Sequence, residues 1–100
     1  MVKKTVIYWR DIPSQVVAQH GRIREKVRLS DRFQEAIDRA AMRAGKGSSD
    51  LYIAEWRRET VECEGNDPGE IAASEARKIE DDHSDDRLLE LVRNHGSAEK

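Results

Sequence analysis

The sequence predicts an α+β domain with a three-stranded antiparallel sheet, one main covering helix and two C-terminal helices, in the order β-β-α-β-α-α. Three patterns carry this prediction. Two of them are the runs of β-branched and aromatic residues and a strongly helical stripe over residues 30–45. A third is the pair of helix-start signals after residue 66. The chain has 100 residues, enough for one domain, which we place at 1–96 with a frayed tail at 97–100.

The N-terminal part of the chain predicts two strands that pair as a hairpin. Residues 4–10, KTVIYWR, concentrate the β-branched and aromatic side chains that favour strands. Pro13 lacks the N–H that a sheet ladder needs, so we expect residues 11–14 to break the strand. Residues 15–20, QVVAQH, then resume the strand pattern.

Residues 21–28, GRIREKVR, have no clean period, and Gly21 is placed to bend or bulge the chain. Residues 26–29 are able to continue the strand. In an extended segment, side chains two positions apart lie on the same face. The segment would therefore align the one basic stripe of the sequence, which consists of Arg22, Arg24, Lys26 and Arg28.

The clearest helix covers residues 30–45, SDRFQEAIDRAAMRAG. Its apolar residues recur with the helical period and form one face: Phe33, Ala36, Ile37, Ala40, Ala41 and Ala44. Ser30 is expected to cap the helix and Gly45 to end it. Because the stripe is mostly alanine, we predict that this helix covers one sheet face closely, with the acidic C-terminal helices on the other face or at an edge.

The second half of the chain predicts one strand and two helices. Residues 51–61, LYIAEWRRETV, read as the third strand, which leaves the core near Trp56. Asp67 followed by proline and, three positions on, glutamate is a strong helix start. Ser84 opens a last short helix with acidic residues in its first turn.

The composition of the chain indicates a protein with a small core and argues against a membrane or secreted protein. Charged residues make up 38% of the chain and hydrophobic ones 37%, so the core must be small. We expect a cytoplasmic protein with no membrane partner, because the chain shows no apolar membrane-spanning run and no signal peptide, and its single Cys63 allows no internal disulfide.

Charge is distributed unevenly along the chain. Residues 1–58 carry 13 Lys and Arg against 7 Asp and Glu, whereas residues 59–100 carry 5 against 13. The two parts either neutralise each other within one fold or attract partners of opposite charge.

Motifs for catalysis or a cofactor are weak. Residues 45–48 resemble the end of a phosphate loop, but the earlier glycine is missing and a helix precedes them. The run EDDHSDD over 80–86 contains metal-binding residue types without calcium-loop spacing, and a solvated helix junction explains it. Glu62 and Glu64 flank Cys63 and disfavour a thiolate. We expect no enzyme activity, no cofactor and no metal.

Aromatic and basic residues are the better functional candidates. Trp, Tyr and Arg anchor protein interfaces, and they also stack on bases and bind phosphates. The alternative is that both tryptophans belong to the core and that the arginines make local ion pairs. The candidate partner-binding residues are Trp9, Arg10, Arg22, Arg24, Trp56, Arg57 and Arg58.

Three blocks carry a family resemblance: KKTVIYWRDIP (3–13), LSDRFQEAIDRAAMRAG (29–45) and YIAEWRR (52–58). Together they resemble the small bacterial virulence factor domain family, which occurs as short stand-alone alphaproteobacterial proteins and as a domain of conserved virulence factor proteins. The resemblance implies a bacterial cytoplasmic protein and brings no catalytic residues. It also implies a link to folate and corrinoid one-carbon enzymes.

We therefore expect a non-catalytic protein-interaction module or accessory subunit whose partner is another protein. Two alternatives stay open. One is a nucleic-acid-binding domain that uses a Trp/Arg sheet face, and the other is an accessory protein of a folate or corrinoid one-carbon enzyme. Whether Trp9 and Trp56 are buried separates a structural role from a binding role.

Overall fold

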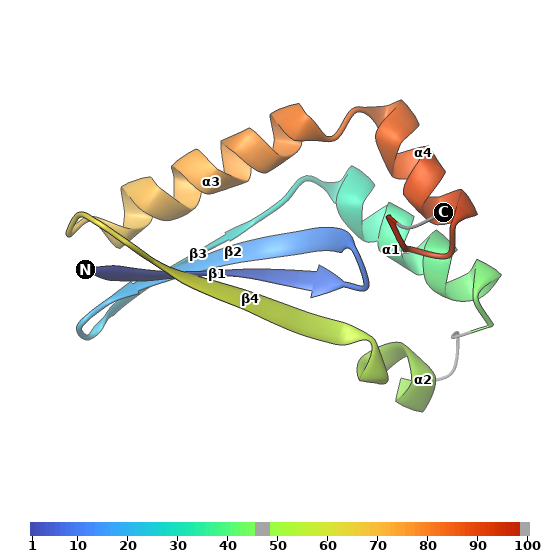
Figure 1. Cartoon of the computed structure of the whole chain (residues 1–100), viewed down its shortest axis with the longest axis horizontal. Coiled ribbons are helices and arrows are strands. Elements are labelled where there is room, and N and C mark those ends of the chain that lie inside the picture. The colour runs from blue at the N-terminus through green and yellow to red at the C-terminus, as the bar shows by residue number, and fades with distance from the viewer. Residues whose placement is uncertain (46–48, 99–100) are drawn as a thin grey trace.

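The computed structural model describes residues 1–45 and 49–98, and it confirms the α+β class. Within these residues one antiparallel sheet has four strands in the order β3-β2-β1-β4 (Figure 1). The strands are β1 (Val2–Trp9), β2 (Ile12–His20), β3 (Ile23–Arg28) and β4 (Trp56–Cys63). The helices are α1 (Asp31–Arg43), α2 (Ser49–Ala54), α3 (Pro68–Asp82) and α4 (Asp85–Arg93).

The predicted hairpin of the first two strands is confirmed, but its break is shorter than residues 11–14, because β2 already begins at Ile12 after a two-residue turn. The pairing register between β1 and β2 shifts so that Ser14 has no counterpart across the ladder. Pro13 lies beside this bulge and is buried. A bulge is one of the few places where a strand accepts proline, since the ladder is already interrupted there.

The sheet has four strands rather than three because residues 23–28 turn back along β2 as a strand of their own. Gly21 has a φ of +59° and lies in the tight turn between them. Glycine adopts this left-handed backbone at no steric cost. β3 is an edge strand, and its side chains are exposed apart from half-buried Val27.

The predicted strand over 51–61 is also wrong in its first half, which belongs to α2. Contacts with β1 favour the helix over the strand in this segment. The Tyr52 ring stacks on Trp9 at 6.0 Å between centroids, and the Tyr52 carbonyl accepts a 2.8 Å hydrogen bond from Trp9 Nε1. These contacts override the strand propensity of the segment. From Trp56 onward the chain pairs antiparallel with β1.

Residues 31–43 form the predicted helix α1, with its apolar stripe buried and with Gly45 at a φ of +72° after its end. The predicted capping bond from Ser30 is absent. Its hydroxyl instead donates to Glu80 of α3, with 2.9 Å between Oγ and Oε1. Ser30 therefore connects α1 to α3.

The helix that covers the sheet is α3, which crosses β1, β2 and β3 (Figure 1). It buries Ala72, Ala76 and Ile79, and Glu75 lies 2.8 Å from Lys4 Nζ on β1. α1 lies at one end of the sheet and packs mainly against α4. The prediction that residues 30–45 cover a sheet face is wrong, because the alanine stripe of α1 finds its main helical partner in α4.

Both predicted helix starts in the C-terminal part are confirmed. The Asp67 side chain accepts the Glu70 N–H at 3.1 Å, and the Ser84 hydroxyl accepts the Arg87 N–H at 3.1 Å. Of the predicted tail 97–100, only residues 97 and 98 are described. Among the described residues, no helix is long and apolar enough to cross a membrane.

Candidate binding surface

Trp9 lies at the end of the sheet that α1, α2 and the turn after α4 cover, which we call the closed end. Its side chain has no exposed area. Tyr52 stacks on one side of it, and a Cβ atom placed on Gly96 would lie only 2.8 Å from its ring. Trp9 is therefore a core residue in this structure, out of reach of a partner.

Arg10 and Arg57 are partly exposed, and both make bonds within the closed end. Arg10 donates from Nη1 to the carbonyl of His95 at 2.9 Å, and its Nε lies 3.3 Å from a Glu55 carboxylate oxygen. Arg57 donates from Nη2 to Asp11 at 2.9 Å and from Nε to the Arg10 carbonyl at 2.6 Å. It also pairs with Glu59. Both guanidinium groups have structural partners.

Asp11 joins the β1–β2 turn to the end of the described chain. Its carboxylate accepts the Ala98 N–H at 2.6 Å as well as the bond from Arg57. The backbone hydrogen bond from Ala98 is the largest influence, and together with Arg57 it holds the pKa of Asp11 below its ordinary value despite partial burial. The charged form of Asp11 is therefore stabilised by the fold.

Trp56 stands at the border of the closed end. It is half-buried, and Tyr52 packs edge-on against it at 5.7 Å between ring centroids. One side of it lines a hollow of about 260 Å³ together with Ile7, Gln15, Arg57 and Arg58. Trp56 thus remains partly accessible, unlike Trp9.

Among the residues that the structure describes, no helix covers the sheet face opposite α3 along most of its length (Figure 1). We call it the open sheet face. The strand register places the following residues on it: Lys3, Thr5, Ile7, Gln15, Val17, Gln19, Arg24, Lys26, Arg28, Arg58, Thr60 and Glu62. The hydroxyls of Thr5 and Thr60 meet at 2.9 Å across β1 and β4.

The open sheet face is shallowly hollowed and positively charged. A groove of about 490 Å³ runs between Arg24 on β3 and Arg58 on β4, with Ile7 and Val17 in its lining. Five cations lie on this face against one acid, Glu62. Within the part of the chain that the structure describes, none of the five side chains makes a hydrogen bond or ion pair: Lys3, Arg24, Lys26, Arg28 and Arg58.

The predicted site residues therefore separate into two groups. Trp9, Arg10 and Arg57 belong to the closed end, whereas Arg24 and Arg58 lie on the open sheet face, with Trp56 at its border. Arg22 occupies the exposed turn before β3. Sequence reasoning omitted Lys3, Lys26 and Arg28 from the site. Lys26 and Arg28 were visible in the basic stripe, but only the pairing of β3 with β2 places them beside Arg24.

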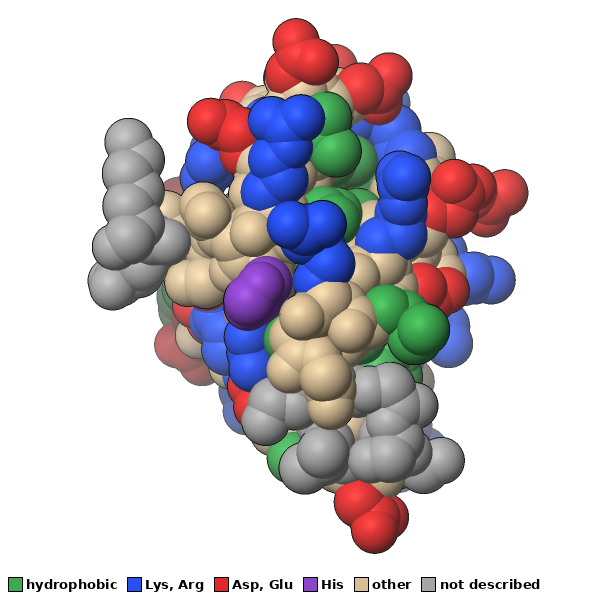
Figure 2. Space-filling view, turned by 90° about the vertical axis from the view of Figure 1, so that its right-hand side faces the viewer, with side chains coloured by type: hydrophobic (Ala, Val, Ile, Leu, Met, Phe, Trp, Pro, Cys, Tyr) green, Lys and Arg blue, Asp and Glu red, His purple; other side chains and the backbone are tan. Residues whose placement is uncertain are grey.

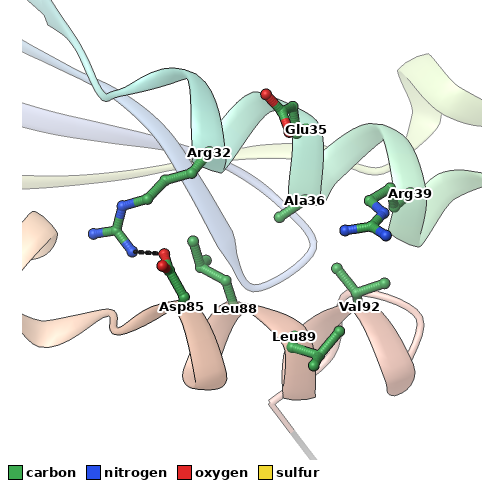
Figure 3. A pocket seen from close by; sticks show the side chains of 8 residues that line it. All are labelled: Arg32, Glu35, Ala36, Arg39, Asp85, Leu88, Leu89 and Val92. Carbon is green, nitrogen blue, oxygen red and sulfur yellow. Dashed lines mark hydrogen bonds and ion pairs between the residues drawn. The ribbon is translucent and has the colours of Figure 1, made fainter.

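A second hollow lies between α1 and α4 (Figure 3). It measures about 150 Å³, and Ala36, Leu88 and Val92 form its apolar part. Arg32 at its rim is bonded to Asp85 at 3.2 Å. Basic and acidic side chains both appear on this end of the molecule, with a few apolar ones between them (Figure 2). This hollow is a seam between two packed helices, and the Arg32–Asp85 ion pair crosses it.

The acidic run over 80–86 helps to hold α1 against α3. Glu80 accepts bonds from the Ser30 N–H at 2.7 Å and from Arg32 at 3.1 Å. Burial alone raises the pKa of Glu80, but the bonds from Ser30 and Arg32 outweigh it and hold that pKa below its ordinary value. In the described part of the chain, no cluster of three or more His, Cys, Asp and Glu is arranged to hold a metal ion.

Comparison with known proteins adds one finding. The model of the virulence factor family matches residues 7–92. The chain belongs to this family. The match reaches into α4, well past the three blocks that suggested the family, and it includes β2, β3 and β4 of the open sheet face. No curated protein and no solved structure matches the chain.

Proposed function

We propose that this member of the virulence factor family is a non-catalytic protein-interaction module, which binds an acidic protein partner through its open sheet face. The observation that carries the proposal is the excess of cations there. Arg24, Lys26, Arg28, Arg58 and Lys3 share one face and have no partner among the described residues. A surface with a strong excess of one sign attracts a partner of the other.

The placement of the acidic residues supports this proposal. Residues 59–100 carry 13 of the 20 Asp and Glu residues of the chain, and α3, which belongs to this acidic part, covers the opposite face of the sheet. The acidic part therefore does not neutralise the open sheet face. An acidic protein surface would meet cations over the groove, with half-buried Ile7 in its lining for apolar contact.

Nucleic acid is the second candidate, favoured by the same cations. Proteins that bind single strands on a sheet face combine cations with aromatic side chains on which bases stack. Here the central strands present Thr5, Ile7, Gln15, Val17 and Gln19 to the open sheet face, and among the described residues of this face only Trp56, at its border, is an accessible aromatic one. The lack of a stacking platform on these strands makes a protein partner the better proposal.

The third alternative, an accessory protein of a folate or corrinoid one-carbon enzyme, is a special case of a protein partner. It requires that the enzyme present an acidic surface to this chain.

The test is a titration of the ¹⁵N-labelled full chain with a polyglutamate peptide, with polylysine of equal length as the matched probe. We expect amide shifts on the open sheet face with polyglutamate alone. The double variant Arg24→Glu/Arg58→Glu should weaken binding about tenfold, because repulsion replaces attraction at two positions. Arg77→Glu on α3 is the control, since Arg77 is also exposed and makes no ion pair with described residues.

Shifts confined to the helices, or equal affinities for the double variant and the control, would contradict the proposal. A single-stranded oligonucleotide serves as a further probe in the same experiment. If it binds the open sheet face more tightly than polyglutamate does, the nucleic-acid alternative replaces the protein partner.

A further inference from the structure

We infer that the acidic partner binds as an added strand along the free edge of β3. The bound segment is extended, with carboxylates at alternate positions and apolar or β-branched residues between them. This inference rests on the proposed function and names the geometry and chemistry of the partner.

The first property is the free edge. In the described part of the chain, β3 pairs only with β2, and it forms one side of the sheet. The outer edge of such a strand presents N–H and C=O groups that an extended peptide can bind through a main-chain ladder. The backbone of β3 is therefore a template for one more strand.

The second property is the alternation of charge. Arg24, Lys26 and Arg28 lie opposite Gln19, Val17 and Gln15 of β2 and so point to the open sheet face. They are spaced at every second residue, about 6.6 Å apart in a strand. In an added strand, every second side chain would lie directly across from one of them. Glutamate or aspartate at those positions gives favourable cross-strand pairs.

The third property is the other face of β3. Ile23, Glu25 and Val27 point toward the side of α3, and Ile23 is 55% exposed although it is apolar. The remaining side chains of an added strand would lie beside these three residues, where an acid would be repelled by Glu25. Apolar or β-branched residues there would remove Ile23 from water. The two faces of β3 together specify the alternating pattern of the partner.

The cations of β3 disfavour a second copy of this chain at its edge, and they also distinguish β3 from the other edge strand, β4. A second copy of β3 would place cations opposite cations, which is unfavourable in a sheet. β4, the other edge, presents both signs: Arg58 and Glu62 share one face, and Arg57 is paired with Glu59 on the other. A basic edge strand also resists non-specific aggregation, and it does so without repelling an acidic strand.

The experiment measures the affinity of the full chain for two synthetic peptides by fluorescence anisotropy. In one peptide glutamate alternates with valine and threonine. In the other, of equal composition, the glutamates are consecutive. We expect the alternating peptide to bind about tenfold more tightly, and Lys26→Glu to weaken that binding about tenfold. Arg58→Glu, on the far strand of the same face, should change it less than about twofold.

Hydrogen exchange provides an independent readout. Amides of β3 should exchange more slowly when the alternating peptide is bound, because the added ladder protects the outward N–H groups. If circular dichroism shows that Lys26→Glu does not fold, Lys26→Gln replaces it. This variant removes the positive charge, and the affinity for the alternating peptide is measured again.

The outcomes separate this inference from the proposed function. If both peptides bind equally and Arg58→Glu weakens binding as much as Lys26→Glu, the partner lies across the face. The added strand is then wrong, while the proposed function stands. If neither peptide binds, both proposals fail. If a single-stranded oligonucleotide binds more tightly than either peptide, nucleic acid replaces both.

Discussion

The closed end and the open sheet face use similar residues from the same strands in different ways. At the closed end Trp9 is buried, and Arg10 and Arg57 have partners within the chain. On the open sheet face Arg58, the next residue along β4, has none among the described residues. Successive side chains of a strand point to opposite faces, so the WRR motif of β4 contributes one structural arginine and one available arginine.

The largest expected effect belongs to the closed end. Trp9→Ala removes a fully buried ring and its hydrogen bond to Tyr52, so we expect the free energy of unfolding to fall by about 3–5 kcal/mol. Urea denaturation measures this. The matched control, Arg58→Ala on the open sheet face, should change it by less than about 0.5 kcal/mol. Similar losses for both variants would remove the distinction between the two regions.

The sequence predicts those features of the closed end and the open sheet face that depend on neighbouring residues. It does not predict the features that depend on contacts between residues far apart in the chain. The α1 stripe and the starts of α3 and α4 are local signals, and all three helices are present. Which helix covers the sheet was not predictable locally, because the apolar sides of α1 and α3 are both rich in alanine. The choice depends on the long-range contact between α1 and α4.

The candidate site was predictable only in part, for a similar reason. The alternation of Arg24, Lys26 and Arg28 is readable in the sequence, but their common face with Arg58 requires the order of the strands. The burial of Trp9 depends on Tyr52 and Gly96, which are far away along the chain. Sequence reasoning therefore grouped Trp9 with Trp56, although only Trp56 is partly accessible.

Gly96→Ala, also at the closed end, should lower the stability of the fold by less than Trp9→Ala does. Gly96 has a φ of +91°, and its new Cβ atom would lie 2.8 Å from the Trp9 ring, which cannot move freely within the core. We expect a loss of about 1–3 kcal/mol in thermal denaturation. Gly21→Ala is the control, since Gly21 also has a positive φ but has open space around it. An equal loss for both variants would show backbone strain alone, without close packing on Trp9.

The smallest effect concerns pH and again separates the two regions. The bonds from Ala98 and Arg57 lower the pKa of Asp11 in the folded chain, so folding favours its charged form. This contribution is complete above the ordinary value of 3.8 and is lost as the pH falls through the lower folded pKa. Asp11→Asn should cost about 1 kcal/mol of stability at neutral pH.

Urea denaturation of wild type and Asp11→Asn at pH 7 and at successively lower pH tests this sign. The difference between them should shrink below the ordinary pKa of Asp11, because the wild-type carboxylate then becomes protonated and loses its advantage. Glu62→Gln is the matched control, an acid on the open sheet face with no hydrogen bond or ion pair to described residues. Two results would contradict a stabilising role for the charge of Asp11. One is a stability difference between wild type and Asp11→Asn that grows as the pH falls, and the other is an equally large difference for Glu62→Gln.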